Sequence, residues 1–236
     1  MTRPEPIELS TWKELSERFE RYSCDHWLFR GVSRSFHELM PSVGREHLLH
    51  DGPTSVVRPF DLDKERRLLE AFKRSARPYI GYNPSNDIEW LALGQHHGLA
   101  TRLLDWTESL FVAAYFATEY GDVRETSRIY CIKEFESFDP QAELNVFKIA
   151  NPYVYRSPHI TARIPAQQAV FTVHNKPEKP LDRDDLVIEL LDIPGKACIK
   201  LKRKLDTAGF NRALLFPDID GLGTHLSWRY KRNLPL

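Results

Sequence analysis

Three segments of the 236-residue chain gather side chains that could do chemistry: residues 27–31 (WLFRG), 94–109 (GQHHGLATRLLDWTES) and 162–171 (ARIPAQQAVF). In the first segment, Arg30 follows Trp27, Leu28 and Phe29 in an apolar run. A guanidinium in such a run is partly desolvated and needs a carboxylate, a carbonyl or a ligand phosphate as partner. Its planar fork suits a bidentate anion. The sequence therefore predicts that Arg30 either binds an anionic ligand or pairs with an internal carboxylate such as Asp105.

The second segment places many hydrogen-bonding side chains between the end of one expected helix and the start of the next: Gln95, His96, His97, Thr101, Arg102, Asp105, Trp106 and Thr107. This density at a junction predicts a binding site. The alternative is that Asp105 or Thr107 caps the following helix, because these residue types are favoured at that position. Neighbouring histidines on a helix point about 100° apart and cannot chelate one metal ion as an i,i+4 pair does. We therefore expect no metal here.

The third segment contains an amide pair, Gln167 and Gln168, between Pro165 and an apolar run. If the pair belongs to the strand, its two side chains point to opposite faces, so one of them lines a cleft. The alternative is a solvated start of the strand, since glutamine is mostly exposed.

Other patterns argue against common chemistries. The DIDG sequence at 218–221 resembles a calcium loop, but the position of the closing glutamate falls on Arg229. The chain has no Walker loop, GxGxxG, GxSxG or HExxH pattern. The basic run Lys200 to Lys204 alternates with apolar residues, which favours a solvated face over a nucleic-acid contact.

Composition predicts a folded chain without a strong electrostatic field. Thirty-three basic residues balance thirty-three acidic ones, and 42% of residues are hydrophobic. Cys24, Cys131 and Cys198 are far apart, so we expect buried free thiols in a reducing compartment rather than a disulfide framework. The N-terminus shows no secretion or transit signal, and no window approaches about 18 apolar residues. We expect a soluble cytoplasmic protein that does not contact membranes.

Periodicity predicts an α+β fold for a single domain, residues 1–236, with a mixed, mainly antiparallel central sheet packed by helices. A loop with many prolines and glycines is expected between the first strand and the second helix. The expected helices are 11–22, capped by Ser10, then 62–77, then one capped by Asp87 that stops at Gly98, and then 108–120. The expected strands are 26–32, 101–106, 128–133, 168–174 and 186–190. Two segments, 197–205 and 211–220, could each be a helix or a strand.

These segments resemble the FRG domain family, which is named for a Phe-Arg-Gly signature. The signature is Phe29-Arg30-Gly31, followed by VSRSF and LMPSVGR, and the longest similar segment is QHHGLATRLLDWTESLFVAAYFA at 95–117. RIPAQQAVFTVH and LLFPDIDGLG extend the resemblance over about residues 20 to 226.

The order of elements is also similar, more weakly, to ADP-ribosyltransferases of the Arg, Ser-Thr-Ser, Glu type. That similarity implies an ADP-ribosyltransferase-like fold and an NAD site, with Arg30, Asp105 and Gln168 as catalytic residues. The implied cofactor-binding residues are Arg30, Gly31, Gln95, His96, Thr101, Arg102, Thr107 and Gln167. The amide pair stands where the acidic pair of that class would be, and an amide cannot offset positive charge as a carboxylate does. Either Asp105 replaces the missing acid, or the fold binds a nucleotide without transfer, or the similarity is only architectural.

Three functions remain open from sequence. The first is a nucleotide-using enzyme related to NAD-dependent ADP-ribosyl transfer or NAD hydrolysis. The second is a non-catalytic binding or regulatory module in which Arg30 and Asp105 form a structural ion pair. The third, which the neutral net charge disfavours, is nucleic-acid binding through a local patch at Lys200 to Lys204.

Overall fold

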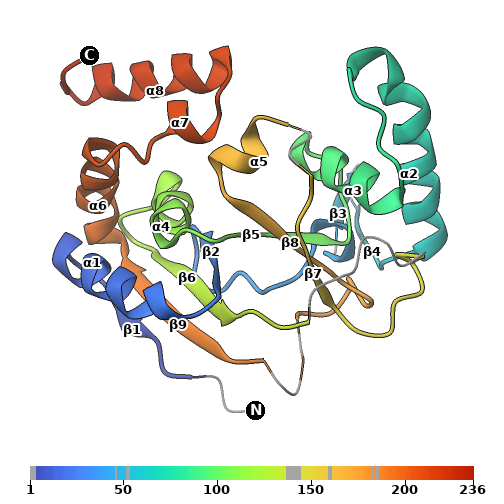
Figure 1. Ribbon diagram of the computed structural model, residues 1–236, viewed down its shortest axis with the longest axis horizontal. Helices are drawn as coiled ribbons and strands as arrows, with labels where there is room; N and C mark the ends of the chain where they lie inside the picture. Colours follow the sequence, from blue (N-terminus) through green and yellow to red (C-terminus); the bar gives the residue numbers. More distant parts are fainter. Residues whose placement is uncertain are drawn as a thin grey trace.

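A seven-stranded mixed sheet forms the centre of the protein (Figure 1). The computed structural model describes residues 4–45, 47–51, 54–136, 145–158, 161–181, 183 and 186–236, with the backbone alone over 47–51 and 54–58. Neighbouring strands are antiparallel except for the parallel pair β1 and β9, which confirms the expected α+β fold and mainly antiparallel sheet. The strand order is β1 (Ile7–Glu8), β9 (Ile188–Pro194), β6 (Thr126–Lys133), β2 (Trp27–Val32), β5 (Leu103–Thr107), β8 (Ala169–Val173) and β7 (Tyr153–Tyr155).

Helices cover one face of this sheet in two groups (Figure 1). In the first, α1 (Trp12–Arg21), α4 (Leu110–Glu119) and α6 (Gly195–Thr207) pack on Phe29 and Ile129. In the second, α2 (Leu62–Ala76) and α3 (Asp87–His96) pack on the far half of the sheet. The short helices α5 (Arg163–Ala166) and α7 (Arg212–Leu215) and the longer α8 (Ile219–Lys231) complete the helical side. The opposite face packs under loop residues, including Leu39 and Leu181.

The close approach of α4 to β2 explains the glycine of the Phe-Arg-Gly signature. A Cβ at Gly31 would lie 1.9 Å from the carbonyl oxygen of Ala113 and 2.6 Å from the nitrogen of Ala117. Phe29, two residues earlier on the same face of the strand, is 3% exposed within the same helix-covered core. Glycine is therefore required here by packing.

Strands β2 and β5 are neighbours that barely pair. Phe29 and Thr107 are their one pair in register, whereas β2 pairs with β6 at six positions and β5 pairs with β8 at five. The two strands therefore diverge beyond Phe29, and the backbone of β2 after this residue has no ladder partner on the β5 side. This divergence opens the sheet beside Arg30.

Two helices begin with a cap that differs from the sequence prediction. Thr11 caps α1 instead of Ser10, and it forms a capping box with Glu14, whose carboxylate accepts the Thr11 N–H at 2.9 Å. Asn86 caps α3 instead of Asp87, because the cap is the last extended residue and its side-chain oxygen accepts the N–H three residues later, here that of Glu89. The expected stop at Gly98 is confirmed by its left-handed φ of 85°.

The region predicted as a continuous loop after the first strand was assigned wrongly. It contains a two-stranded hairpin, β3 (His47–Asp51) and β4 (Thr54–Arg58), which stands outside the main sheet. The open assignments at 197–205 and 211–220 are resolved as helices α6 and α7, with α8 following. The strands β1 and β7 have two and three residues, too few for a periodic signal.

The environment of the cysteines agrees with the prediction at two of three positions. Cys131 and Cys198 are buried free thiols, whereas Cys24 is exposed, so its predicted burial was wrong. Within the described residues, no helix combines the length and the apolar character needed to cross a bilayer.

Candidate functional site

A pocket of about 560 Å³ lies where β2 and β5 diverge, between the two groups of helices. Its wall combines positive, acidic, amide and aromatic side chains. Strands β2 and β5 provide Arg30, Gly31, Asp105, Trp106 and Thr107; helices α3 to α5 provide Gln95, His96, Phe116 and Arg163; Gln167 follows α5; and the loops provide His37, Glu38, Arg45 and Phe216. A volume of this order is typical of small-molecule sites, which span roughly 300–1,000 Å³.

Arg30 lies in the opening between the two strands and is anchored to β5. Its Nη1 donates to the main-chain oxygen of Asp105 at 2.7 Å and lies 3.6 Å from the Asp105 carboxylate. The Nε atom of Arg30 is buried and has no hydrogen-bond partner among the described residues. Burial lowers the pKa of Arg30, and the charge of Asp105 opposes that shift. The guanidinium is therefore paired with Asp105, as one of the two alternatives predicted, and it also lines the pocket.

A chain of hydrogen bonds fixes the carboxylate of Asp105. The hydroxyl of Thr101 is fully buried, accepts the Leu103 N–H at 3.1 Å and donates to Gln95 Oε1 at 2.6 Å. This fixes the amide so that Gln95 Nε2 donates to Asp105 Oδ2 at 2.8 Å. Thr101 itself does not line the pocket, so it acts on the pocket through Gln95.

Thr107 and Gln167 join the end of β5 to α5. Thr107 Oγ1 donates to the carbonyl of Gln167 at 2.7 Å and accepts the Ser109 N–H at 3.1 Å. The Gln167 amide donates to the carbonyl of Leu215 at 2.9 Å. Neither Asp105 nor Thr107 caps α4, as the alternative interpretation required; Ser109 does, because it is the residue whose side chain accepts the Val112 N–H.

Gln168 does not line the pocket. It is exposed and adopts a left-handed φ of 45°, at the turn that joins α5 to β8. Strand β8 begins only at Ala169. The prediction that both glutamines belong to the strand, with their side chains on opposite faces, was therefore wrong. One amide does face the pocket, and it is that of Gln167.

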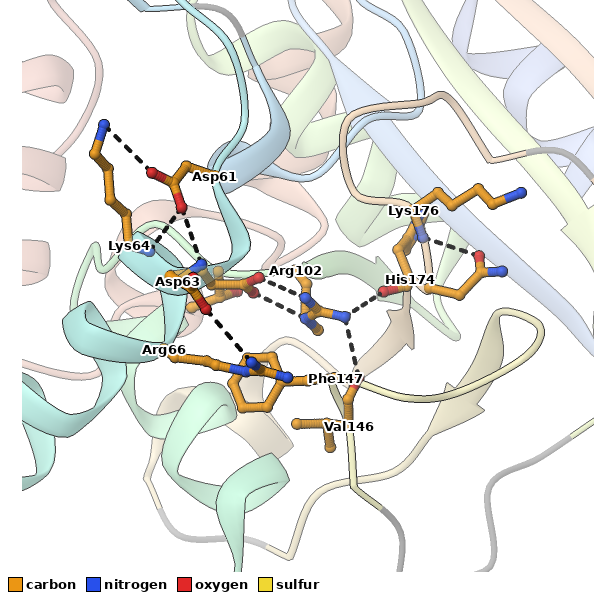
Figure 2. Close-up of polar contacts among 12 residues, drawn as sticks. Asp61, Asp63, Lys64, Arg66, Arg102, Val146, Phe147, His174 and Lys176 are labelled. Atoms are coloured by element: carbon orange, nitrogen blue, oxygen red, sulfur yellow. Dashed lines mark hydrogen bonds and ion pairs between the residues drawn. The ribbon is translucent and has the colours of Figure 1, made fainter.

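Arg102 is buried and does not line the pocket, and Figure 2 shows its polar contacts. Its guanidinium forms two hydrogen bonds with the carboxylate of Glu65 and donates to the carbonyls of Val146 and His174. The side chains of Arg102 and Glu65 are 2% and 1% exposed. With four hydrogen bonds formed and its charge paired, Arg102 joins α2 to the start of β5 and the end of β8.

His96 faces the pocket with one nitrogen buried and unpaired. Its ring meets Phe171 edge-on at 5.6 Å, and Nε2 has no hydrogen-bond partner among the described residues. Burial lowers the pKa of His96, with Asp105 opposing the shift. The neutral imidazole is thus favoured at pH 7, and it can donate to or accept from a ligand.

Sequence reasoning missed the pocket residues contributed by loops and short helices. Arg163, on α5, donates to the carbonyl of His96 at 3.2 Å and pairs with Asp218 at 2.6 Å. Its guanidinium lies over the ring of Phe216, 5.2 Å from the centroid. Both residues stand in segments that carried the family resemblance, yet nothing in their local pattern indicates that they meet.

These features define an α+β protein with one open mixed sheet and an arginine-bearing pocket where that sheet parts. A model of the FRG domain family matches residues 25–126, so an FRG domain is present in this chain. The match runs from β2 to the first residue of β6 and includes Arg30, Gln95 and Asp105, while Arg163 and Phe216 lie beyond it. No curated protein and no solved structure is significantly similar to the chain.

Proposed function

We propose that the FRG-domain pocket binds a nucleotide, with NAD as the specific candidate, and that the protein cleaves its nicotinamide–ribose bond. The observation that carries this proposal is the placement of Arg30 and Asp105 together on the wall of one pocket of about 560 Å³. A fixed guanidinium suits a phosphate, and a fixed carboxylate suits the positive charge that develops on the ribose.

The proposed chemistry needs one anionic group beside the reacting carbon. Cleavage breaks the bond between ribose C1′ and the nicotinamide nitrogen, and the bonding electrons leave with neutral nicotinamide. The sugar becomes an oxocarbenium ion, and water then attacks C1′ and releases a proton to give ADP-ribose. Asp105 is the candidate stabiliser because Gln95 orients it and half of its side chain is exposed. Gln167, and not Gln168, is the candidate amide for the ribose.

A charge-removing substitution tests this proposal. Asp105→Asn keeps the shape of the side chain, so NAD should still raise the melting temperature while nicotinamide release falls at least about a hundredfold. Asp220→Asn, on the exposed first turn of α8, is the matched control and should behave as wild type. Wild-type protein that neither releases nicotinamide nor gains thermal stability with NAD refutes the proposal.

A non-catalytic binding module is the second candidate. It is favoured by the hydrogen bonds that occupy polar groups of the pocket internally, notably Arg30 Nη1 on the Asp105 carbonyl and the Gln167 amide on Leu215. The same experiment separates the candidates, because this module would bind nucleotide without releasing nicotinamide. Binding that is identical in wild type and Asp105→Asn, with no turnover in either, would support it.

A further inference from the structure

The rim of the pocket formed by residues 33–45 carries two arginines and a histidine beside one carboxylate, Glu38. His37 and Arg45 line the pocket on this side, and Arg34 lies close by in the sequence. Arg45 Nε donates to the carbonyl of Met40 at 3.1 Å. Within the described ranges, no carboxylate lies at ion-pair distance from Arg34 or Arg45, whereas Arg163, which also lines the pocket, pairs with Asp218.

This segment is held in place before any ligand arrives. The Ser35 N–H donates to the carbonyl of Thr126 at 2.7 Å, and the Tyr130 hydroxyl donates to the carbonyl of His37 at 2.7 Å. Farther along, Ser42 Oγ accepts the N–H of Thr101 at 3.2 Å. The rim is therefore tied to β6 and to the segment just before β5, and little conformational entropy remains to be lost when it binds a ligand.

The guanidinium groups of this rim act on one another and on His37, whose neutral imidazole they favour. Burial lowers the pKa of His37, and the guanidinium groups of Arg45, Arg34 and Arg30 lower it further. Arg45 also lowers the pKa of Arg30. Like charges placed together repel, and an anion bound among them removes that repulsion. Arg30, whose buried Nε has no partner among the described residues, lines the same pocket.

We propose that His37 and Arg45, with Arg34 beside them, form a second anion subsite next to Arg30, and that the two subsites together take a diphosphate group. This inference deepens the proposed function and rests on it, because it assigns the ligand class of the same pocket: a small molecule with two linked phosphates rather than a monophosphate or a neutral nucleoside. Two adjacent guanidinium groups match the oxygens of linked phosphates.

Calorimetric titration with inorganic pyrophosphate and with orthophosphate tests the subsite without any nucleotide. Wild-type protein at low salt should bind pyrophosphate at least tenfold more tightly than orthophosphate. Arg45→Gln should lose that preference, and His37→Gln should weaken it. Arg67→Gln on the exposed side of α2 is the matched control and should retain wild-type binding. Equal affinity for the two anions, no binding of either, or an unchanged preference in Arg45→Gln would overturn the inference.

A parallel titration with NAD keeps the two proposals separable. Pyrophosphate binding that depends on Arg45, together with no response to NAD, would leave the subsite standing and reject the nucleotide function. NAD binding and turnover that are the same in Arg45→Gln as in wild type would support the function and reject the subsite. Because Arg45 is exposed, its substitution should leave the circular dichroism spectrum and the melting temperature unchanged, which rules out unfolding as the cause.

Discussion

The Arg30 guanidinium lies 3.6 Å from the Asp105 carboxylate, and the two side chains differ in exposure, at 16% and 50%. This asymmetry decides how the pair behaves. The arginine fills the opening between β2 and β5 and donates to the main chain of Asp105, so it supports the sheet. The carboxylate faces the pocket, held by Gln95, and is free on its exposed side to meet a ligand.

We predict that Arg30→Lys folds but loses most of its affinity for anionic ligands. An ammonium keeps the charge, yet it cannot donate to the Asp105 carbonyl and present a planar fork to a ligand at the same time. Leaving that carbonyl short of a donor should cost about 1–3 kcal/mol of unfolding free energy. Urea denaturation checks the stability, and calorimetry with pyrophosphate should show at least a tenfold loss of affinity. A variant that binds as well as wild type contradicts the role given to the guanidinium.

We predict that Gly31→Ala is strongly destabilising although it adds one methyl group. The new Cβ would overlap the main chain of α4 at Ala113, and backbone atoms cannot turn aside as a flexible side chain can. Forcing α4 away from the sheet should lower the unfolding free energy by about 3 kcal/mol. Gly223→Ala is the matched control, because nothing lies within 4 Å of its added Cβ and α8 should gain about 1 kcal/mol. Thermal unfolding of both variants measures the difference, and similar melting temperatures would show that β2 and α4 can separate.

The sequence was sufficient for the elements that carry strong periodicity or a long apolar run. The first helix, the Arg30 strand, α2, α3 and the buried α4 were all expected near their observed positions. Prediction from residue type was wrong at the helix caps: the last extended residue before α1 is Thr11, not Ser10. It also failed in the proline-rich segment, since the register of a hairpin depends on a partner strand as well as on composition.

The candidate site was predicted in part, because only some of its residues stand out from the local sequence by their type and surroundings. The pairing of Arg30 with Asp105 was one of two alternatives for a guanidinium in an apolar run, and the structure shows that pair. Arg102 has the same local character, yet it pairs with Glu65, 37 positions earlier, which no local pattern indicates. Arg45 and Phe216 reach the pocket through loops, whose course is set by tertiary packing.

We predict that breaking the ion pair between Arg102 and Glu65 destabilises the fold without a direct effect on the pocket. Glu65→Gln leaves a buried guanidinium without its counter-charge, which should cost about 3–5 kcal/mol of unfolding free energy. Denaturant titration measures the loss. In the surviving folded fraction, anion affinity should equal that of wild type, because Arg102 does not reach the pocket.

An exposed pair on the same helix is the control for this prediction. Arg66 and Asp63 lie 3.5 Å apart on α2, with side chains 41% and 72% exposed. Asp63→Asn should therefore cost less than about 1 kcal/mol. Replacing both Arg102 and Glu65 with leucine should not restore stability, because the carbonyls of Val146 and His174 would lose their donor. Recovery in that double variant would show that the carbonyls find other partners.

We predict that acidification destabilises the protein through His174. Its ring is buried and bonded to Thr172 at 3.0 Å, and burial, with the charges of Arg30 and Arg102, lowers its pKa to about 3. An unfolded histidine has a pKa near 6.5, so the unfolded chain binds the proton first and stability falls as pH drops below about 6.5. Between pH 7 and pH 5 this group should cost about 2 kcal/mol of unfolding free energy.

The comparison with His174→Gln isolates that contribution from other titrating groups. Glutamine keeps a polar side chain near Thr172 but takes up no proton, so its unfolding free energy should fall less steeply than that of wild type over the same pH range. The exposed His26, changed to glutamine, is the control and should leave the wild-type slope intact. Parallel curves for His174→Gln and wild type would mean that the buried imidazole finds a way to bind its proton in the folded state.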